Sequence, residues 1–400
     1  MSSITLSPTQ TLAETKAVSH AAPVNLPVYI YAVVFASFCI TVGLIWDISW
    51  HTSIGRDGLF SPPHLATYIG AVTSGIFSGY YVLRLTFAGS TEEKQQSIKF
   101  WKVFYGSLGA LFCIWGAFAM ITSAPFDDWW HNTFGLDVQI LSPPHTVLLL
   151  GMVTIQFGAM VSVIALQNRQ SAINTYSSKA ISWCFLLSSG FLLVMLFTIA
   201  SEYLTRHDMH RSLFYKVSSG LFPLFLVAVS RASTSKWGAT HMAAVYTIVM
   251  ALMVWILPLF HAEPKLGPVF NHITNYQSFH FPLLLIFPAL AIDWLNQRLQ
   301  NQQPIVKALA LGVSFTLILF AVQWPFGDFL SGPYARNWFF GTTSWYFGSD
   351  PNFIFRYDFA PYKVDQGPVL IIGLTIACVF GVLSSWLGLA WGRWMKSVKR

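Results

Sequence analysis

The apolar stretch PVYIYAVVFASFCITVGLIW, residues 27–46, runs directly into Asp47-Ile-Ser-Trp50-His51. About 20 consecutive apolar residues are needed to cross the roughly 30 Å hydrocarbon core of a bilayer. An Asp and a His four residues apart lie on the same face of a helix. The stretch therefore predicts a helix that crosses a membrane and carries Asp47 and His51 on one face at its end.

The composition extends this prediction to the whole chain. Of its 400 residues, 54% are hydrophobic and 10% are charged, whereas a soluble domain carries about 25% charged residues. We therefore predict an all-α fold, a polytopic integral membrane protein in contact with the lipid bilayer. Ten apolar stretches are long enough to span it: 27–46, 64–86, 103–124, 145–166, 182–202, 212–230, 241–260, 279–296, 306–325 and 367–390.

The distribution of basic residues predicts the orientation. If the N-terminus is cytoplasmic, most of the 23 Lys and Arg residues fall in cytoplasmic segments, as the positive-inside rule requires. Both termini are then cytoplasmic, and the segment after Asp47 faces the periplasm of a bacterial inner (plasma) membrane. This distribution accounts for the net charge of +7, so we expect no nucleic-acid partner.

Three parts follow from the pattern of spans. Residues 1–26 form a polar cytoplasmic leader, and residues 27–170 form a domain with an internal duplication. Residues 180–400 form a second transmembrane region with an outer loop at 325–363 that is rich in aromatic residues. We expect this loop to lie on the membrane interface or to cap the helices, because aromatic side chains favour the interface over free solution.

The duplication is visible as a polar motif that occurs twice, about eighty residues apart. Each copy predicts a helix leaving the membrane, a short outer loop and a returning helix, so the two copies are parallel repeats. The first copy contains Asp47, His51, Gly55, Asp57 and Ser61-Pro62-Pro63-His64. The second contains Asp127, His131, Gly135, Asp137 and Ser142-Pro143-Pro144-His145.

The residue types of this motif suit a metal ion. Ser-Pro is a typical helix start, and an imidazole near a helix N-terminus is favoured in the neutral form that binds metals. An Asp near a helix C-terminus is stabilised by a cation. Interfacial residues at ordinary helix starts are the alternative for either copy alone. The repetition predicts two metal sites, made by Asp47, His51 and His64 and by Asp127, His131 and His145.

Two nitrogens and one oxygen suit Zn, Cu, Fe or Ni, and the affinity order favours Cu among divalent ions. Three protein ligands also leave a coordination position open for a reactant. Asp57 and Asp137 are candidates for supporting the ligands, or else are turn residues. Asp128 competes with Asp127, but the four-residue spacing to His131 favours Asp127.

Residues 30–166 resemble the C subunit of the copper membrane monooxygenases, the particulate methane and ammonia monooxygenase family. That subunit carries an Asp-x3-His-x12-His copper site and a second site similar to Asn-x3-His-x13-His. Asp127 stands where the family has Asn. The residues that match the first site and its surroundings are Asp47, Trp50, His51, Arg56, Asp57, Phe60, Pro62 and His64.

A weaker similarity to the family's A subunit covers residues 279–335, and no segment resembles its soluble B subunit. The resemblance implies one or two copper ions, activation of dioxygen and oxidation of a small apolar substrate. It also implies an electron donor such as a quinol, a membrane or periplasmic partner subunit, and a homo- or hetero-oligomer. A non-catalytic copper-binding or copper-handling protein shares these ligands, and a structural subunit that pairs helices through the motif is a third alternative.

One further cluster of polar residues lies outside the repeats. Glu202, His207 and His210 follow the fifth predicted span. They are candidates for another site or a proton shuttle, and solvated loop residues are the favoured interpretation. The sequence contains no P-loop and no nucleophile elbow.

Overall fold

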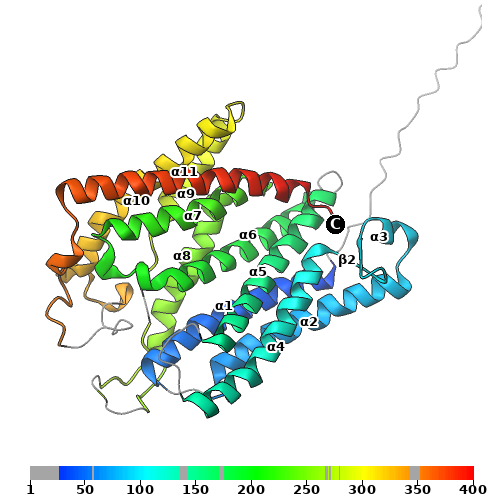
Figure 1. Ribbon diagram of the computed structural model, residues 1–400, viewed down its shortest axis with the longest axis horizontal. Coiled ribbons are helices and arrows are strands. Elements are labelled where there is room, and N and C mark those ends of the chain that lie inside the picture. Colours follow the sequence, from blue (N-terminus) through cyan, green and yellow to red (C-terminus); the bar gives the residue numbers. More distant parts are fainter. Residues whose placement is uncertain are drawn as a thin grey trace, which may run out of the picture.

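The computed structural model describes residues 27–55, 58–135, 142–170, 175–265, 269, 272–278, 280–341 and 352–400. Long helices make up most of this part of the chain (Figure 1). Within it the one sheet is a hairpin in which β1 (Ile98–Phe100) pairs antiparallel with β2 (Phe104–Gly106). The predicted all-α class is confirmed. The leader, residues 1–26, lies outside the described residues.

Four long helices form the N-terminal region: α1 (Val28–Ser53), α2 (Pro62–Ala88), α4 (Leu108–Phe134) and α5 (Pro143–Gln170). They lie side by side in the blue and cyan part of Figure 1. The link between α2 and α4 contains the short helix α3 (Thr91–Gln95) and the β1–β2 hairpin. Ser90 and Glu93 begin α3 with a reciprocal pair of side-chain to backbone hydrogen bonds, the capping box that stabilises a helix start.

The C-terminal region consists of further α-helices, with short 3₁₀ turns in several of the links between them. α7 and α11 run alongside one another over most of their length (Figure 1). The helices are α6 (Thr175–Ala200), α7 (Ser212–Ala232), α8 (Gly238–Ile256), α9 (Ile286–Arg298), α10 (Pro304–Ser331) and α11 (Gly367–Ser397). The turns are η1 (Ser201–Tyr203), η2 (Arg206–Asp208), η3 (Leu257–Leu259), η4 (Pro333–Ala335), η5 (Trp338–Phe340) and η6 (Pro361–Lys363).

Among the described residues, eight helices are long and apolar enough to cross a bilayer: α1, α4, α5, α6, α7, α8, α10 and α11. This number of apolar helices indicates a multi-pass membrane protein. The helix α2 has 27 residues, which is sufficient length, but it is less apolar than the eight. Ten membrane spans are predicted from the sequence, and the helices support eight of that number.

The predicted span 279–296 differs most from the structure. Its helical part, α9, has 13 residues and is therefore only about 20 Å long. The preceding residues are not helical, because side chains from two neighbouring helices satisfy their backbone donors. The Leu283 N–H donates to the Tyr246 hydroxyl at 3.0 Å, and the Leu284 N–H donates to Gln323 Oε1 at 2.9 Å.

The two helix pairs of the N-terminal region pack through equivalent positions. A Cβ atom added to Gly70 of α2 would lie 2.8 Å from the Ala36 carbonyl oxygen of α1. A Cβ atom added to Gly151 of α5 would lie 2.9 Å from the Gly116 carbonyl oxygen of α4. Small residues allow this close backbone approach between membrane helices. The repeat in the sequence is therefore matched by a repeat in packing.

A buried polar contact joins α1 of the first pair to α5 of the second. The Gln156 side-chain amide donates to the Ser37 carbonyl oxygen at 2.9 Å and to Thr41 Oγ1 at 3.0 Å. Ser37 Oγ donates in return to Gln156 Oε1. All three residues are buried. Since hydrogen bonds between helices stabilise association within a bilayer, this contact fixes the two repeats against each other.

The described part of the aromatic loop packs on the helices. α10 continues through Pro325 to Ser331, so the loop begins later than predicted. Within η5, the Phe339 carbonyl accepts a hydrogen bond from the Trp255 indole of α8 at 2.9 Å. The Phe340 ring contacts Phe281 and Phe329. Residues 342–351 of the predicted loop lie outside the described residues.

We predict that Gly151→Leu destabilises the protein, because its added atoms would overlap Met120 and the Gly116 carbonyl. Overpacking of this kind costs about 1–3 kcal/mol. Gly79→Leu on α2 is the matched control, since no atom lies within 4 Å of its added Cβ. Thermal unfolding in detergent should show a lower melting temperature for Gly151→Leu alone. An equal loss in both variants would contradict the packing described.

Candidate metal centres

The first predicted set of ligands comes together where α1 ends and α2 begins. Asp47 lies between the two histidines. Its Oδ1 atom is 3.3 Å from His64 Nε2 and its Oδ2 atom is 3.8 Å from His51 Nε2. The carboxylate thus contacts one imidazole from its own helix and one from the returning helix. We call these three residues the first triad.

The second set, the second triad, has the same arrangement at the ends of α4 and α5. Asp127 Oδ1 is 3.2 Å from His145 Nε2, and Asp127 Oδ2 is 3.5 Å from His131 Nε2. One ligand atom from each residue lies within 4.8 Å of the others. Across the described part of the chain, this is the set of His, Cys, Asp and Glu residues that meets this limit. The second triad is therefore the more compact of the two.

Local structure explains why the ligands converge. The helices α1 and α4 continue past the predicted ends at residues 46 and 124, so each Asp and His pair lies on one helical face. Both outgoing segments then turn at a glycine, Gly55 with φ 88° and Gly135 with φ 89°. Other residues rarely adopt this conformation.

The returning helices α2 and α5 begin at Pro62 and Pro143, as the Ser-Pro pattern predicts. His64 and His145 are the third residues of these helices. The Ser142 hydroxyl accepts a hydrogen bond from the His145 backbone N–H at 3.4 Å. Ser61 is also an N-cap, but its side chain makes no capping bond. The rigid helix starts hold both imidazoles toward the carboxylates.

Backbone carbonyls orient one imidazole in each triad. His64 Nδ1 is 3.0 Å from the Gly58 carbonyl oxygen, and His131 Nδ1 is 3.2 Å from the Gly135 carbonyl oxygen. In a neutral imidazole, the nitrogen that faces the carbonyl carries the proton, so the lone pair is on Nε2. The Nε2 atoms of both residues face the carboxylates. The sequence contains no signal for these carbonyls, because any residue could supply one.

The donor atoms fit a metal ion. Asp47 Oδ1 and Asp127 Oδ1 are buried and have no hydrogen-bond partner, although each is close to an imidazole nitrogen. Ligand atoms about 2.0–2.2 Å from a tetrahedral metal are roughly 3.3–3.6 Å apart. The Asp–His distances of the second triad, 3.2 and 3.5 Å, are close to this range. The first triad is more open, with 3.8 Å between Asp47 and His51, and does not bring one ligand atom of each residue within 4.8 Å of the others. In each triad, one divalent ion would give the carboxylate and the imidazole lone pairs a common partner.

The other residues predicted near the triads have different positions. Asp128 is exposed, and its carboxylate accepts a hydrogen bond from the Asn132 amide at 3.3 Å. Asp127, which the spacing favours, is the aspartate that faces the histidines. Asp57 and Asp137 lie outside the described residues. Their predicted support of the ligands stays a prediction.

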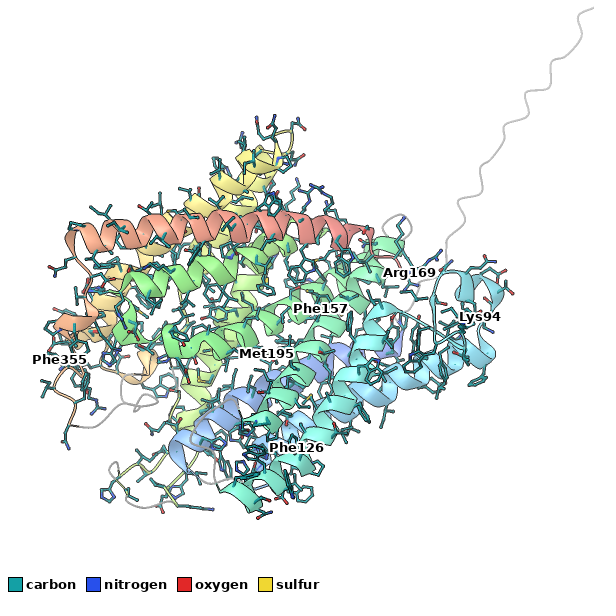
Figure 2. All side chains as sticks on the ribbon, viewed as in Figure 1. Lys94, Phe126, Phe157, Arg169, Met195 and Phe355 are labelled. Carbon is teal, nitrogen blue, oxygen red and sulfur yellow. The ribbon has the colours of Figure 1, made fainter. Side chains whose placement is uncertain are left out.

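Different neighbours support the two triads. Ser49 Oγ donates to the Gln277 carbonyl at 2.6 Å, and the Gln277 N–H donates to Ser53 Oγ at 2.7 Å. These bonds hold the end of α1 against the C-terminal region. The end of α4 instead carries its own aromatic cluster, formed by Phe126, Trp129, Trp130 and Phe134. Figure 2 labels Phe126 near this end.

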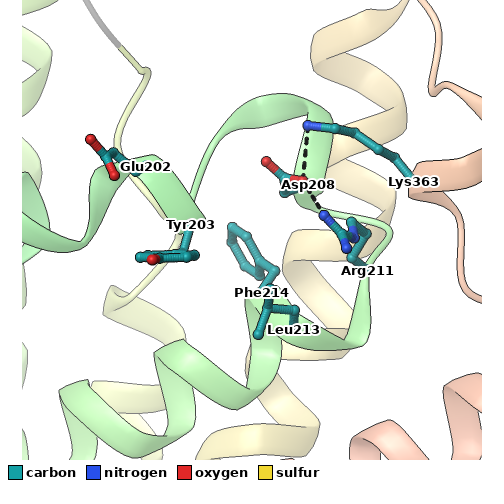
Figure 3. Close-up of a pocket in the computed structure, with 7 residues that line it drawn as sticks. All are labelled: Glu202, Tyr203, Asp208, Arg211, Leu213, Phe214 and Lys363. Atoms are coloured by element: carbon teal, nitrogen blue, oxygen red, sulfur yellow. Dashed lines mark hydrogen bonds and ion pairs between the residues drawn. The ribbon is translucent and has the colours of Figure 1, made fainter. Parts of the chain in front are cut away.

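Glu202, His207 and His210 lie apart from the triads, between α6 and α7. Glu202 lines a cavity of about 230 Å³, in which Asp208 is paired with Lys363 at 3.0 Å and Arg211 at 3.4 Å (Figure 3). The favoured interpretation of these residues as solvated loop residues is wrong for His210.

The His210 ring is 7% exposed and stacks between Trp324 and Phe359. Its Nε2 atom lies 3.2 Å from the Trp324 carbonyl oxygen and 3.3 Å from Asp328 Oδ1. These partners come from two distant segments of the chain, so no local pattern predicts them. His210 therefore packs against the C-terminal end of α10.

Two histidines near this cavity are held neutral. Burial, and next the Arg206 guanidinium, lower the pKa of His207 from 6.5 to about 4. Burial, and next Arg206, lower the pKa of His280 to about 3. The charged form of each imidazole is disfavoured because it would lose hydration beside a cation. The sequence does not show that residues 206 and 280 lie close together.

No family model, curated protein or solved structure matches this chain. The fold and the triads therefore define the protein only as an all-α, multi-pass membrane protein with two Asp-His-His clusters at helix ends.

We predict that each triad binds one copper ion in metal-depleted protein resupplied with Cu²⁺. His64→Ala and His145→Ala should each remove one ion per chain. Loss of a residue that only supports a ligand weakens metal affinity about 10–100-fold, and loss of the ligand itself should weaken it at least as much. Asp128→Ala is the matched control and should retain both ions. Mass spectrometry of the metal content gives the stoichiometry. Equal copper in all four proteins would exclude the triads as the sites.

We also predict that acidification destabilises the metal-free protein between about pH 6.5 and pH 4. In this range the unfolded chain binds protons at His207 and His280 that the folded chain does not bind, so stability falls as the pH falls. Melting temperatures across this range should vary less in the His207→Gln, His280→Gln double variant. His261→Gln, an exposed residue, is the control. A double variant with the wild-type pH dependence would contradict the prediction.

Proposed function

We propose that this protein is a copper-containing, membrane monooxygenase-like enzyme that uses dioxygen to oxidise a small apolar substrate. The observation that supports this most strongly is the pair of triads in which a buried carboxylate oxygen faces imidazole nitrogens without a hydrogen bond. The resemblance of these residues, apart from Asp127, to the copper membrane monooxygenases supplies the metal and the reaction class. Two nitrogens and one oxygen leave a position for a reactant.

The residues of each triad have distinct roles in this proposal. Asp47 and Asp127 supply negative charge and one oxygen ligand each. The Gly58 and Gly135 carbonyls keep His64 and His131 in the form whose Nε2 can bind a metal. Bound copper would supply the redox chemistry that activation of dioxygen requires. Asp127 in place of the family's Asn gives the second centre a stronger preference for a divalent ion.

The surroundings of the triads favour an apolar substrate. Phe60, Trp129 and Phe134 are 73%, 53% and 63% exposed at the helix ends that carry the ligands. Aromatic side chains concentrate where hydrocarbon meets water, so an apolar molecule dissolved in the bilayer would reach the triads laterally. We place this end on the periplasmic side of a bacterial inner membrane. The electrons would come from a quinol or another membrane donor, with a partner subunit in a homo- or hetero-oligomer.

The direct test is incorporation of ¹⁸O into product. Copper-loaded protein in nanodiscs would receive a short-chain quinol, a short alkane and ¹⁸O₂, with the alcohol detected by gas chromatography and mass spectrometry. We expect labelled alcohol from the wild type and from Asp128→Ala, and a loss of at least 100-fold in Asp127→Ala. Product formation that survives in both Asp127→Ala and Asp47→Ala would overturn the proposal.

A non-catalytic copper-handling protein is the second candidate. The exposure of the ligands favours it, since the side chains of His51 and His145 are 40% and 29% exposed, which would allow exchange of the ion. This function predicts transfer of copper to a soluble chelator without oxygen consumption. Retention of copper through many turnovers of substrate would exclude it.

A further inference from the structure

Three basic side chains in the C-terminal region come from the ends of three helices, and one of them, Arg231, lies near each of the other two. Arg231 is in the last turn of α7, Lys307 is in the first turn of α10, and Arg393 is near the end of α11. Arg231 is close enough to both other residues for electrostatic repulsion. We call these three residues the basic cluster. It is remote in sequence from both triads.

Helix packing holds these like charges together. A Cβ atom added to Gly392 would lie 2.8 Å from the Ala228 carbonyl oxygen and 2.9 Å from Arg231 Cβ. α11 therefore approaches α7 closely beside Arg231. A Cβ atom added to Gly312 would lie 2.5 Å from the Gly381 carbonyl oxygen, so α10 is equally close to α11. The three helices cannot separate to relieve the repulsion without losing these contacts.

No acidic side chain of the described residues forms an ion pair with the basic cluster. Arg231 Nε is buried without a hydrogen-bond partner. Lys307 is only 8% exposed, and its ammonium group donates to the Gln300 carbonyl at 2.6 Å. Asp293 is near Ser230, but Thr240 and the Ala239 N–H already engage its carboxylate, at 2.7–3.2 Å. The positive charge of the cluster is thus uncompensated.

We propose that the basic cluster binds the phosphate headgroup of an anionic phospholipid. Guanidinium and ammonium groups form charge-assisted hydrogen bonds to phosphate oxygens, and basic pockets between membrane helices bind anionic headgroups. The same helices provide a surface for the acyl chains, because apolar side chains next to the cluster are exposed: Ile305, Val306, Leu309, Leu387 and Trp394. Free phosphate shares the headgroup chemistry but would not use this apolar surface. The proposal does not depend on the triads or on copper.

The test is thermal unfolding of delipidated protein in detergent with added phosphatidylglycerol, phosphatidylcholine or inorganic phosphate. We expect phosphatidylglycerol to raise the melting temperature of the wild type in a concentration-dependent manner, since a ligand of the folded state stabilises it. Arg231→Gln and Arg393→Gln should each lose more than half of this rise. Lys396→Gln, an exposed basic residue of the same helix end, is the matched control and should keep it.

Arg393 is exposed, so Arg393→Gln should fold even if Arg231→Gln does not. An equal rise with phosphatidylglycerol in Arg393→Gln and wild type would overturn the proposal, as would an equal rise with phosphatidylcholine. A rise with inorganic phosphate as large as that with phosphatidylglycerol would overturn the assignment to a lipid.

Discussion

The contact between a partly buried carboxylate and two imidazoles, one at each of its oxygens, is the constraint on which the rest of the N-terminal region depends. Asp47 Oδ1 and Asp127 Oδ1 are withdrawn from solvent without a hydrogen bond, and such an unsatisfied buried group costs about 1–3 kcal/mol or more when charged. A bound cation would give each of these oxygens a partner.

The scaffold explains why this contact occurs twice. Close approach of α2 to Ala36 and of α5 to Gly116 sets the spacing of each helix pair, and the buried amide of Gln156 fixes one pair against the other. The polar ligands then lie at the end of each pair, beyond the apolar part of the helices. This division separates stability, which comes from packing within the bundle, from the proposed metal binding at its edge.

Sequence periodicity predicted the parts of the site that depend on local geometry. Spacing placed Asp47 with His51 on one helical face, and Ser-Pro placed His64 and His145 at helix starts. It could not predict contacts that depend on tertiary structure, such as the Gly58 carbonyl at His64 or the aromatic rings around His210. The predicted helix before α9 is absent because of such tertiary contacts. The Tyr246 and Gln323 side chains accept hydrogen bonds from the backbone of this segment.

The central claim is that each triad is the ligand set of one metal ion. X-ray absorption spectroscopy of the copper-loaded protein tests it most directly, because imidazole scattering reports the number of histidines per copper. We expect about two imidazoles and one oxygen around each copper, and a loss of imidazole scattering in a His64→Ala, His145→Ala double variant. Sulfur ligation, or a spectrum that is unchanged in the double variant, would contradict it.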